Sequence, residues 1–138
     1  MIFTRYMPSL NNPREDPFVL WLTGGPGCSS MLASVIELGP CFVQRKGQDG
    51  GKDRPNPFGW NARANLIFLD QPVGTGFSTV DGAEFSSTSD IAARHVWQFM
   101  KTFFSEEFSR DAVQRYGNNV HHVRTNQEFY VTGESYAG

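Results

Sequence analysis

The residues best suited to chemistry lie near the end of the sequence, where a short apolar run leads into Gly133 and Ser135. Residues 129–132 (FYVT) are typical of a strand. A serine just beyond a strand, flanked by the small residues Gly133 and Ala137, fits a nucleophile elbow. In such a turn the strained backbone presents the hydroxyl, and small neighbours allow close contact. Ser135 is therefore the candidate nucleophile, and the competing interpretation is a strand that ends at an ordinary surface serine.

A glycine-rich loop at residues 23–28 (TGGPGC) is the second candidate. An acyl-transfer oxyanion needs two N–H donors. One comes from the residue after the nucleophile, here Tyr136, and one from an early glycine-rich loop. The loop lacks the lysine of a P-loop, and Ser30 stands where a dinucleotide-binding motif starting at Gly25 needs its last glycine. The alternative is a plain turn whose glycines only supply positive φ.

Strands and helices must hold these two loops. The apolar runs 18–22 and 66–69 predict buried strands. Residues 129–132 predict a third strand, and residues 2–6 predict a weaker one. Ser29 and Ser30 are expected to cap a helix that runs to Leu38, and Ser89–Asp90 a longer helix. Residues 44–61 predict a long loop. The alternation of strands and helices predicts an α/β fold with a mostly parallel sheet. The apolar side of the longer helix is expected to contain Ile91, Val96, Phe99, Met100, Phe103 and Phe104.

Length and charge limit the function further. The 138 residues predict one domain, residues 1–138, which we expect to be part of a longer protein because the sequence stops inside the serine motif. A net charge of −2 argues against a basic nucleic-acid binder. No apolar run approaches the ~18 residues of a membrane span, and the first residues lack the apolar core of a secretory signal.

Five motifs in order resemble the serine carboxypeptidases of the α/β-hydrolase superfamily. They are WLTGGPGCSS (21–30), ELGP (37–40), NPFGWN (56–61), NLIFLDQPVGTGFS (65–78) and GESYAG (133–138). The resemblance covers nearly the whole chain from about residue 18, and it implies the N-terminal part of an α/β-hydrolase fold whose C-terminal part is missing. It also implies an enzyme that releases C-terminal residues from peptides through an acyl-enzyme, without a metal or organic cofactor.

The resemblance assigns roles to individual residues. Ser135 is the nucleophile, and the backbone N–H groups of Gly25 and Tyr136 form the oxyanion hole. The triad aspartate and histidine follow the serine in this superfamily, so they are expected outside these residues. Residues 1–138 by themselves are therefore expected to be inactive. A non-catalytic fragment is the corresponding alternative from a different class of function.

The resemblance also implies a site for the C-terminal carboxylate of a peptide substrate, formed by Gly24, Glu134 and Glu37. Two carboxyl groups that share a site cannot both ionise cheaply, so one is expected to keep a proton and donate it to the substrate. The residues alone favour a solvated glutamate at Glu37. The family usually has asparagine where this chain has Thr23, which puts carboxylate recognition at that position in question. A serine carboxypeptidase-like acyltransferase or esterase is therefore a second hypothesis.

The remaining polar residues are expected to be structural. Asp70 ends a strand but precedes the serine, contrary to the hydrolase order, and predicts a structural loop. His95 falls inside the predicted long helix, while His121 and His122 predict a solvated pair, and no metal-ligand spacing is present. Cys28 and Cys41 could pair with each other, stay reduced or pair with cysteines outside these residues. The resemblance implies a partner for Cys28 far downstream, so Cys28 is expected to be unpaired here, and Cys41 has no assigned partner. It also implies a vacuolar, lysosomal or secreted protein.

Overall fold

The computed structural model describes residues 1–44, 52–80, 88–105 and 127–138. Four strands form one sheet in the order β1-β5-β2-β6, and a two-residue ladder pairs β3 with β4. The elements are β1 (Thr4–Met7), β2 (Phe18–Leu22), α1 (Met31–Ile36), β3 (Cys41–Phe42), β4 (Arg54–Pro55), the 3₁₀ turn η2 (Trp60–Ala62), β5 (Asn65–Leu69), α2 (Ser89–Phe103), β6 (Phe129–Gly133) and the 3₁₀ turn η4 (Ser135–Ala137).

The sheet is mostly parallel, as the sequence predicts. Strand β2 lies at its centre and pairs in parallel with both β5 and β6, while β1 pairs antiparallel with β5 at the edge. Parallel neighbours place their carboxyl ends at one edge of a sheet, where α/β proteins build their sites. The register sets Leu22 of β2 opposite Gly133 of β6. The glycine-rich loop and the serine turn therefore leave the sheet side by side.

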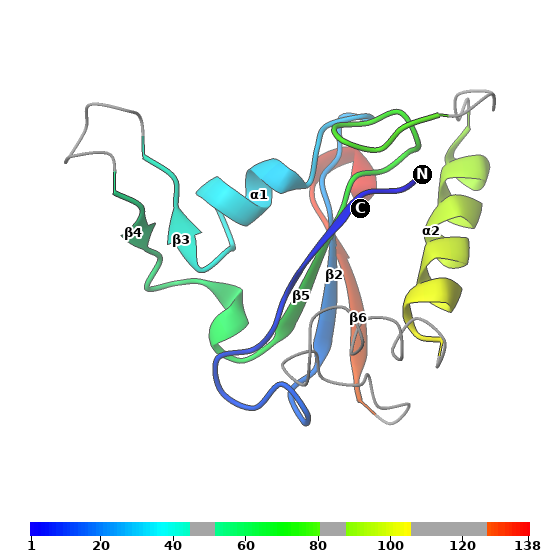
Figure 1. Ribbon diagram of the computed structural model, residues 1–138. Helices are drawn as coiled ribbons and strands as arrows, with labels where there is room; N and C mark the ends of the chain where they lie inside the picture. Colours follow the sequence, from blue (N-terminus) through cyan, green and yellow to red (C-terminus); the bar gives the residue numbers. More distant parts are fainter. Residues whose placement is uncertain (45–51, 81–87, 106–126) are drawn as a thin grey trace.

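Figure 1 shows α1 and α2 on opposite faces of the sheet. Alternating side chains of the central strands supply a core on each of these faces. Val19 and Leu66 pack on the face that carries α1, whereas Leu20 and Ile67 pack on the face that carries α2. Strands buried on both faces are apolar throughout, which is why β2 and β5 are continuous apolar runs. None of the helices in the described ranges is long and apolar enough to cross a membrane.

Several boundaries differ from the sequence predictions. Helix α1 ends at Ile36 rather than Leu38, because the Leu38 N–H bonds back to the Ala33 carbonyl in a tight turn. The cap of α2 is Thr88, whose hydroxyl accepts from the Ile91 N–H at 3.3 Å, one residue before the predicted cap. Ile91 is 38% exposed and does not join the core.

The other five predicted core residues of α2 do face the sheet. Phe103 is buried, and Val96, Phe99, Met100 and Phe104 pack against the same cluster. The predicted loop at 44–61 contains two structured parts that the sequence reasoning missed: β4, which pairs with β3, and the start of η2 at Trp60. Two residues per strand are too few for a hydrophobic alternation to mark them. Residues 45–51 of this stretch, and His121 and His122, lie outside the described residues.

Candidate active site

Ser135 sits in a strained turn directly after β6. Its φ is 58°, and it is the one residue other than glycine with a positive φ in the described ranges. An L-residue in this conformation costs about 1–2 kcal/mol. The turn is held by hydrogen bonds from the Glu134 N–H to Leu22 O and from the Ala137 N–H to Glu134 O, both 3.2 Å. The geometry is that of a nucleophile elbow rather than of a strand with a surface serine.

Glycine is required on both sides of this turn. A methyl group on Gly133 would lie 2.6 Å from the Ala137 carbonyl oxygen. One on Gly24 would lie 2.5 Å from Tyr136 N and 2.6 Å from Glu134 O. Real Cβ atoms essentially never come so close, so the glycine-rich loop and the elbow are in backbone contact. The sequence predicted both motifs, and the structure brings them together.

Within the described ranges, three amides around Ser135 have no hydrogen-bond acceptor and could bind a ligand oxygen. The backbone N–H groups of Gly24, Gly25 and Tyr136 donate no hydrogen bond to any described residue. Gly25 has φ +114°, so the loop needs glycine at this position, as the plain-turn interpretation also predicts. The loop in addition presents the Gly24 and Gly25 N–H groups, which donate to no described residue. Two preorganised backbone donors beside a nucleophile can stabilise a developing oxyanion. The Ser135 hydroxyl is exposed and is likewise unpaired within the described ranges.

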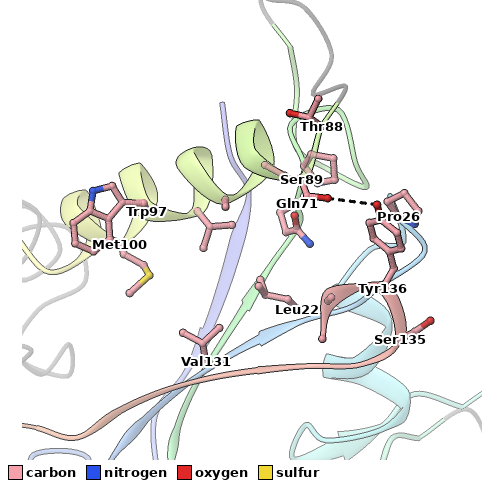
Figure 2. Close-up of a pocket in the computed structure, with 17 residues that line it drawn as sticks. Leu22, Pro26, Gln71, Thr88, Ser89, Trp97, Met100, Val131, Ser135 and Tyr136 are labelled. Carbon is pink, nitrogen blue, oxygen red and sulfur yellow. Dashed lines mark hydrogen bonds between the residues drawn. The ribbon is translucent and has the colours of Figure 1, made fainter.

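A cleft of about 840 Å³ lies between α2 and β6, and its lining includes Gly24, Ser135 and Tyr136. Its wall is largely apolar and includes Leu22, Val96 and Met100. Figure 2 shows the Ser135 side chain pointing away from this cleft, whereas the Tyr136 ring rises along it toward Ser89. The Tyr136 and Ser89 hydroxyl groups lie 3.4 Å apart. The Ser135 hydroxyl thus points out of a cleft that its own residue helps to line.

The predicted carboxylate-binding residues are placed in two groups. Gly24 and Glu134 lie at the elbow, with Glu134 exposed. Glu37 is the exposed C-terminal cap of α1, and within the described ranges no hydrogen bond links its carboxyl group to that of Glu134. Their pairing stays a prediction. Thr23 is half-buried, and its Oγ1 accepts a hydrogen bond from Trp21 Nε1 at 3.1 Å, a partner that the sequence reasoning did not identify.

The other polar candidates are placed away from Ser135 Oγ. Asp70 is fully buried and bonds to Ser29 and to the Phe77 amide, so it is structural, as predicted. His95 lies on α2, where its Nδ1 atom is buried without a hydrogen-bond partner. Cys28 and Cys41 are exposed free thiols. Within the described ranges, no three histidine, cysteine or acidic residues gather as a metal site.

The mostly parallel sheet with its flanking helices corresponds to part of an α/β-hydrolase fold. The sequence profile of the serine carboxypeptidase family matches residues 1–138. The chain belongs to this family.

Relatives of known name agree with this assignment. "Carboxypeptidase Y homolog A" of Sclerotinia sclerotiorum is 40% identical over 139 residues, covering 99% of this chain and 21% of the relative. A vacuolar serine-type carboxypeptidase of Saccharomyces cerevisiae is 40% identical over 138 residues, covering 99% and 23%. The crystal structure of a prohormone-processing carboxypeptidase from Saccharomyces cerevisiae has a TM-score of 0.72 at 27% identity, covering 99% and 26%. The chain thus spans about a quarter or less of these proteins.

The contact between Gly24 and the elbow yields a prediction. Replacing Gly24 with alanine should destabilise the protein by about 1–3 kcal/mol, because the added methyl must displace the Glu134–Tyr136 backbone. The displacement should shift the Tyr136 amide resonance in a ¹H–¹⁵N NMR spectrum.

The matched control is Gly27→Ala, where the nearest atom to an added methyl is 3.8 Å away. That substitution also costs about 1–2 kcal/mol, because Gly27 has a positive φ, but it should leave the Tyr136 resonance in place. A Tyr136 amide that is unmoved by Gly24→Ala would contradict the backbone contact.

Proposed function

We propose that this chain carries the nucleophile and the oxyanion hole of a serine-type carboxypeptidase that releases C-terminal residues from peptides. The observation that carries the proposal is the strained Ser135 turn, whose Tyr136 amide lies against the glycine-rich loop. Ser135 Oγ attacks the scissile carbonyl carbon and forms an acyl-enzyme, and the departing amine takes a proton. The Gly25 and Tyr136 amides stabilise the carbonyl oxygen while it carries negative charge.

A base must take the Ser135 proton during attack. Among the described residues, no imidazole bonds to Ser135 Oγ. By resemblance to the family, the base is a histidine that an aspartate orients, and both follow the nucleophile in the sequence. On this proposal, residues 1–138 alone lack the acyl-transfer activity of the intact site.

The substrate on this proposal is a peptide with a free C-terminal carboxylate. The Gly24 amide and Glu134 are placed beside Ser135, within reach of a group that follows the scissile bond. Their place supports a role in holding the terminal carboxylate, with a protonated carboxyl of Glu134 or Glu37 as a donor. A vacuolar, lysosomal or secreted location is proposed from the vacuolar relative.

An acyltransferase or esterase on the same scaffold is the second candidate, and the Thr23 contact favours keeping it. The Trp21 N–H already donates to Thr23 Oγ1, so this side chain offers one hydroxyl proton to a ligand. An asparagine amide at the same position has two N–H donors. Weaker recognition of a terminal carboxylate would suit substrates that lack one.

Replacing Ser135 with alanine in the natural protein should lower kcat for peptide hydrolysis by about 10⁶-fold, because the covalent nucleophile is lost. A fluorophosphonate probe should label the unaltered protein at Ser135 and fail to label the variant. The control is Ser105→Ala, at the C-terminal end of α2, which should keep both activity and labelling. Labelling that persists without the Ser135 hydroxyl would contradict the proposal.

Thr23→Asn separates the two candidate substrate classes. If Thr23 adjoins the carboxylate site, the added amide should raise kcat/KM for a free-acid peptide relative to its C-terminal amide. One hydrogen bond to a charged group contributes about 1.5–3 kcal/mol, so the ratio should rise about tenfold or more. Thr23→Ser keeps the hydroxyl and isolates the contribution of the amide. A ratio that Thr23→Asn leaves unchanged would place Thr23 outside the carboxylate site.

A further inference from the structure

Asp70 is a buried carboxylate that the proposed reaction does not use. It follows β5 and is fully buried. Its Oδ1 accepts from Ser29 Oγ at 2.6 Å, and its Oδ2 accepts from the Phe77 N–H at 3.0 Å. No lysine or arginine of the described ranges pairs with it. Burying a carboxylate without a cation is costly, so both of its oxygens need these donors.

The space around this carboxylate is closed. A methyl group on Gly76 would collide with Asp70 Oδ2 and would lie 2.8 Å from Ser29 Oγ. Gly76 also has φ +54°, a conformation that suits glycine. The Ser78 hydroxyl adds a hydrogen bond to the Asp70 carbonyl at 2.7 Å. The carboxylate is thus fixed between the loop that follows β5 and the loop that follows β2.

Ser29 connects this carboxylate to the glycine-rich loop. The turn before it is closed by a hydrogen bond from the Cys28 N–H to Gly24 O at 3.1 Å. The neighbouring Ser30, fully buried, accepts from the Thr23 N–H at 3.0 Å. Hydrogen bonds therefore hold the segment with the Gly24 and Gly25 amides at both ends. Ser30 binds the Thr23 amide at its start, and Ser29, just beyond its end, binds Asp70. The sequence analysis expected these two serines only as helix caps.

We propose that Ser29 and Asp70 are positioning residues that hold the Gly25 amide in place as an oxyanion donor. The inference rests on the proposed function, because it needs Ser135 to generate an oxyanion. A hydrogen bond to an ionised acceptor is shorter and stronger than one between neutral groups. Such a bond resists displacement of a loop whose donors must be set before the reaction begins. Neither side chain touches the substrate.

The test is Ser29→Ala in the natural protein. We expect kcat on a peptide, and the affinity for a peptide boronic acid, to fall about tenfold. That loss is smaller than the 10²–10³-fold effect of removing an oxyanion donor outright, because the Gly25 amide is only loosened. KM should stay within about twofold, since substrate contacts in the ground state are retained. Ser29→Thr keeps the hydroxyl and should restore both values.

The matched control is Ser9→Ala. Ser9 Oγ donates to Asp16 Oδ2 at 2.5 Å, a bond of the same type at the opposite end of β2. This bond is the main reason that the pKa of Asp16 lies below its ordinary value. Removing it should lower the melting temperature and leave kcat and boronic acid affinity unchanged. Equal kcat in folded Ser29→Ala and Ser9→Ala variants would overturn the positioning role.

If Ser29→Ala does not fold, Asp70→Asn makes the same comparison. Ser29 and Phe77 donate to different carboxylate oxygens, and the NH₂ group that replaces one of those oxygens cannot accept a hydrogen bond. An unchanged kcat in folded Asp70→Asn would overturn the inference. Failure of the proposed function has a different signature, since Ser135→Ala would then keep its activity whatever Ser29 does.

Discussion

The candidate site depends on how closely the backbone at Gly24 approaches the turn at Ser135. Parallel pairing of β2 with β6 sets Leu22 opposite Gly133, so the two loops begin at the same level. A side chain at position 24 would occupy the place of the Glu134 carbonyl and the Tyr136 amide. Because residue 24 is a glycine, the glycine-rich loop can contact the turn at Ser135. The amides of Gly25 and Tyr136, which donate to no described residue, therefore belong to two segments in direct contact. Neither loop alone offers a serine with two neighbouring donors.

The strain at Ser135 is supported from the side of β2, because β6 and the turn itself are largely exposed. A positive φ at a non-glycine residue persists only where the surroundings over-determine it. Here β6 is held in register by β2, whose residues Phe18 and Leu20 are buried almost completely. On the other side of the site, the buried carboxylate of Asp70 anchors the loops that follow β2 and β5. The carboxyl ends of β2, β5 and β6 thus hold an exposed serine in a fixed turn, the arrangement on which the proposed acyl transfer depends.

Local signals in the sequence were enough to predict the strands of the sheet and the turn at Ser135. They were not enough to predict the contacts between residues far apart in the sequence. Phe18–Leu22 has the predicted bounds, because a strand buried on both faces is marked by its own apolar residues. Ser135 was predicted as the nucleophile because an elbow needs small residues at fixed offsets, and its positive φ agrees with such a turn. The Ser29–Asp70 bond joins residues 41 positions apart and leaves no periodic pattern. Ile91 was wrongly predicted to join the core, since it is 38% exposed in the first turn of α2. Packing rather than hydropathy decides its exposure.

The central claim is that Ser135, Gly25 and Tyr136 act on one reacting carbonyl group. The most direct measurement is a crystal structure of the natural protein with a peptide boronic acid bound. The account predicts a covalent bond from Ser135 Oγ to boron and one boronate oxygen about 2.7–3.1 Å from both the Gly25 and Tyr136 amide nitrogens. Boron attached to another residue, or a boronate oxygen that contacts neither amide, would contradict it.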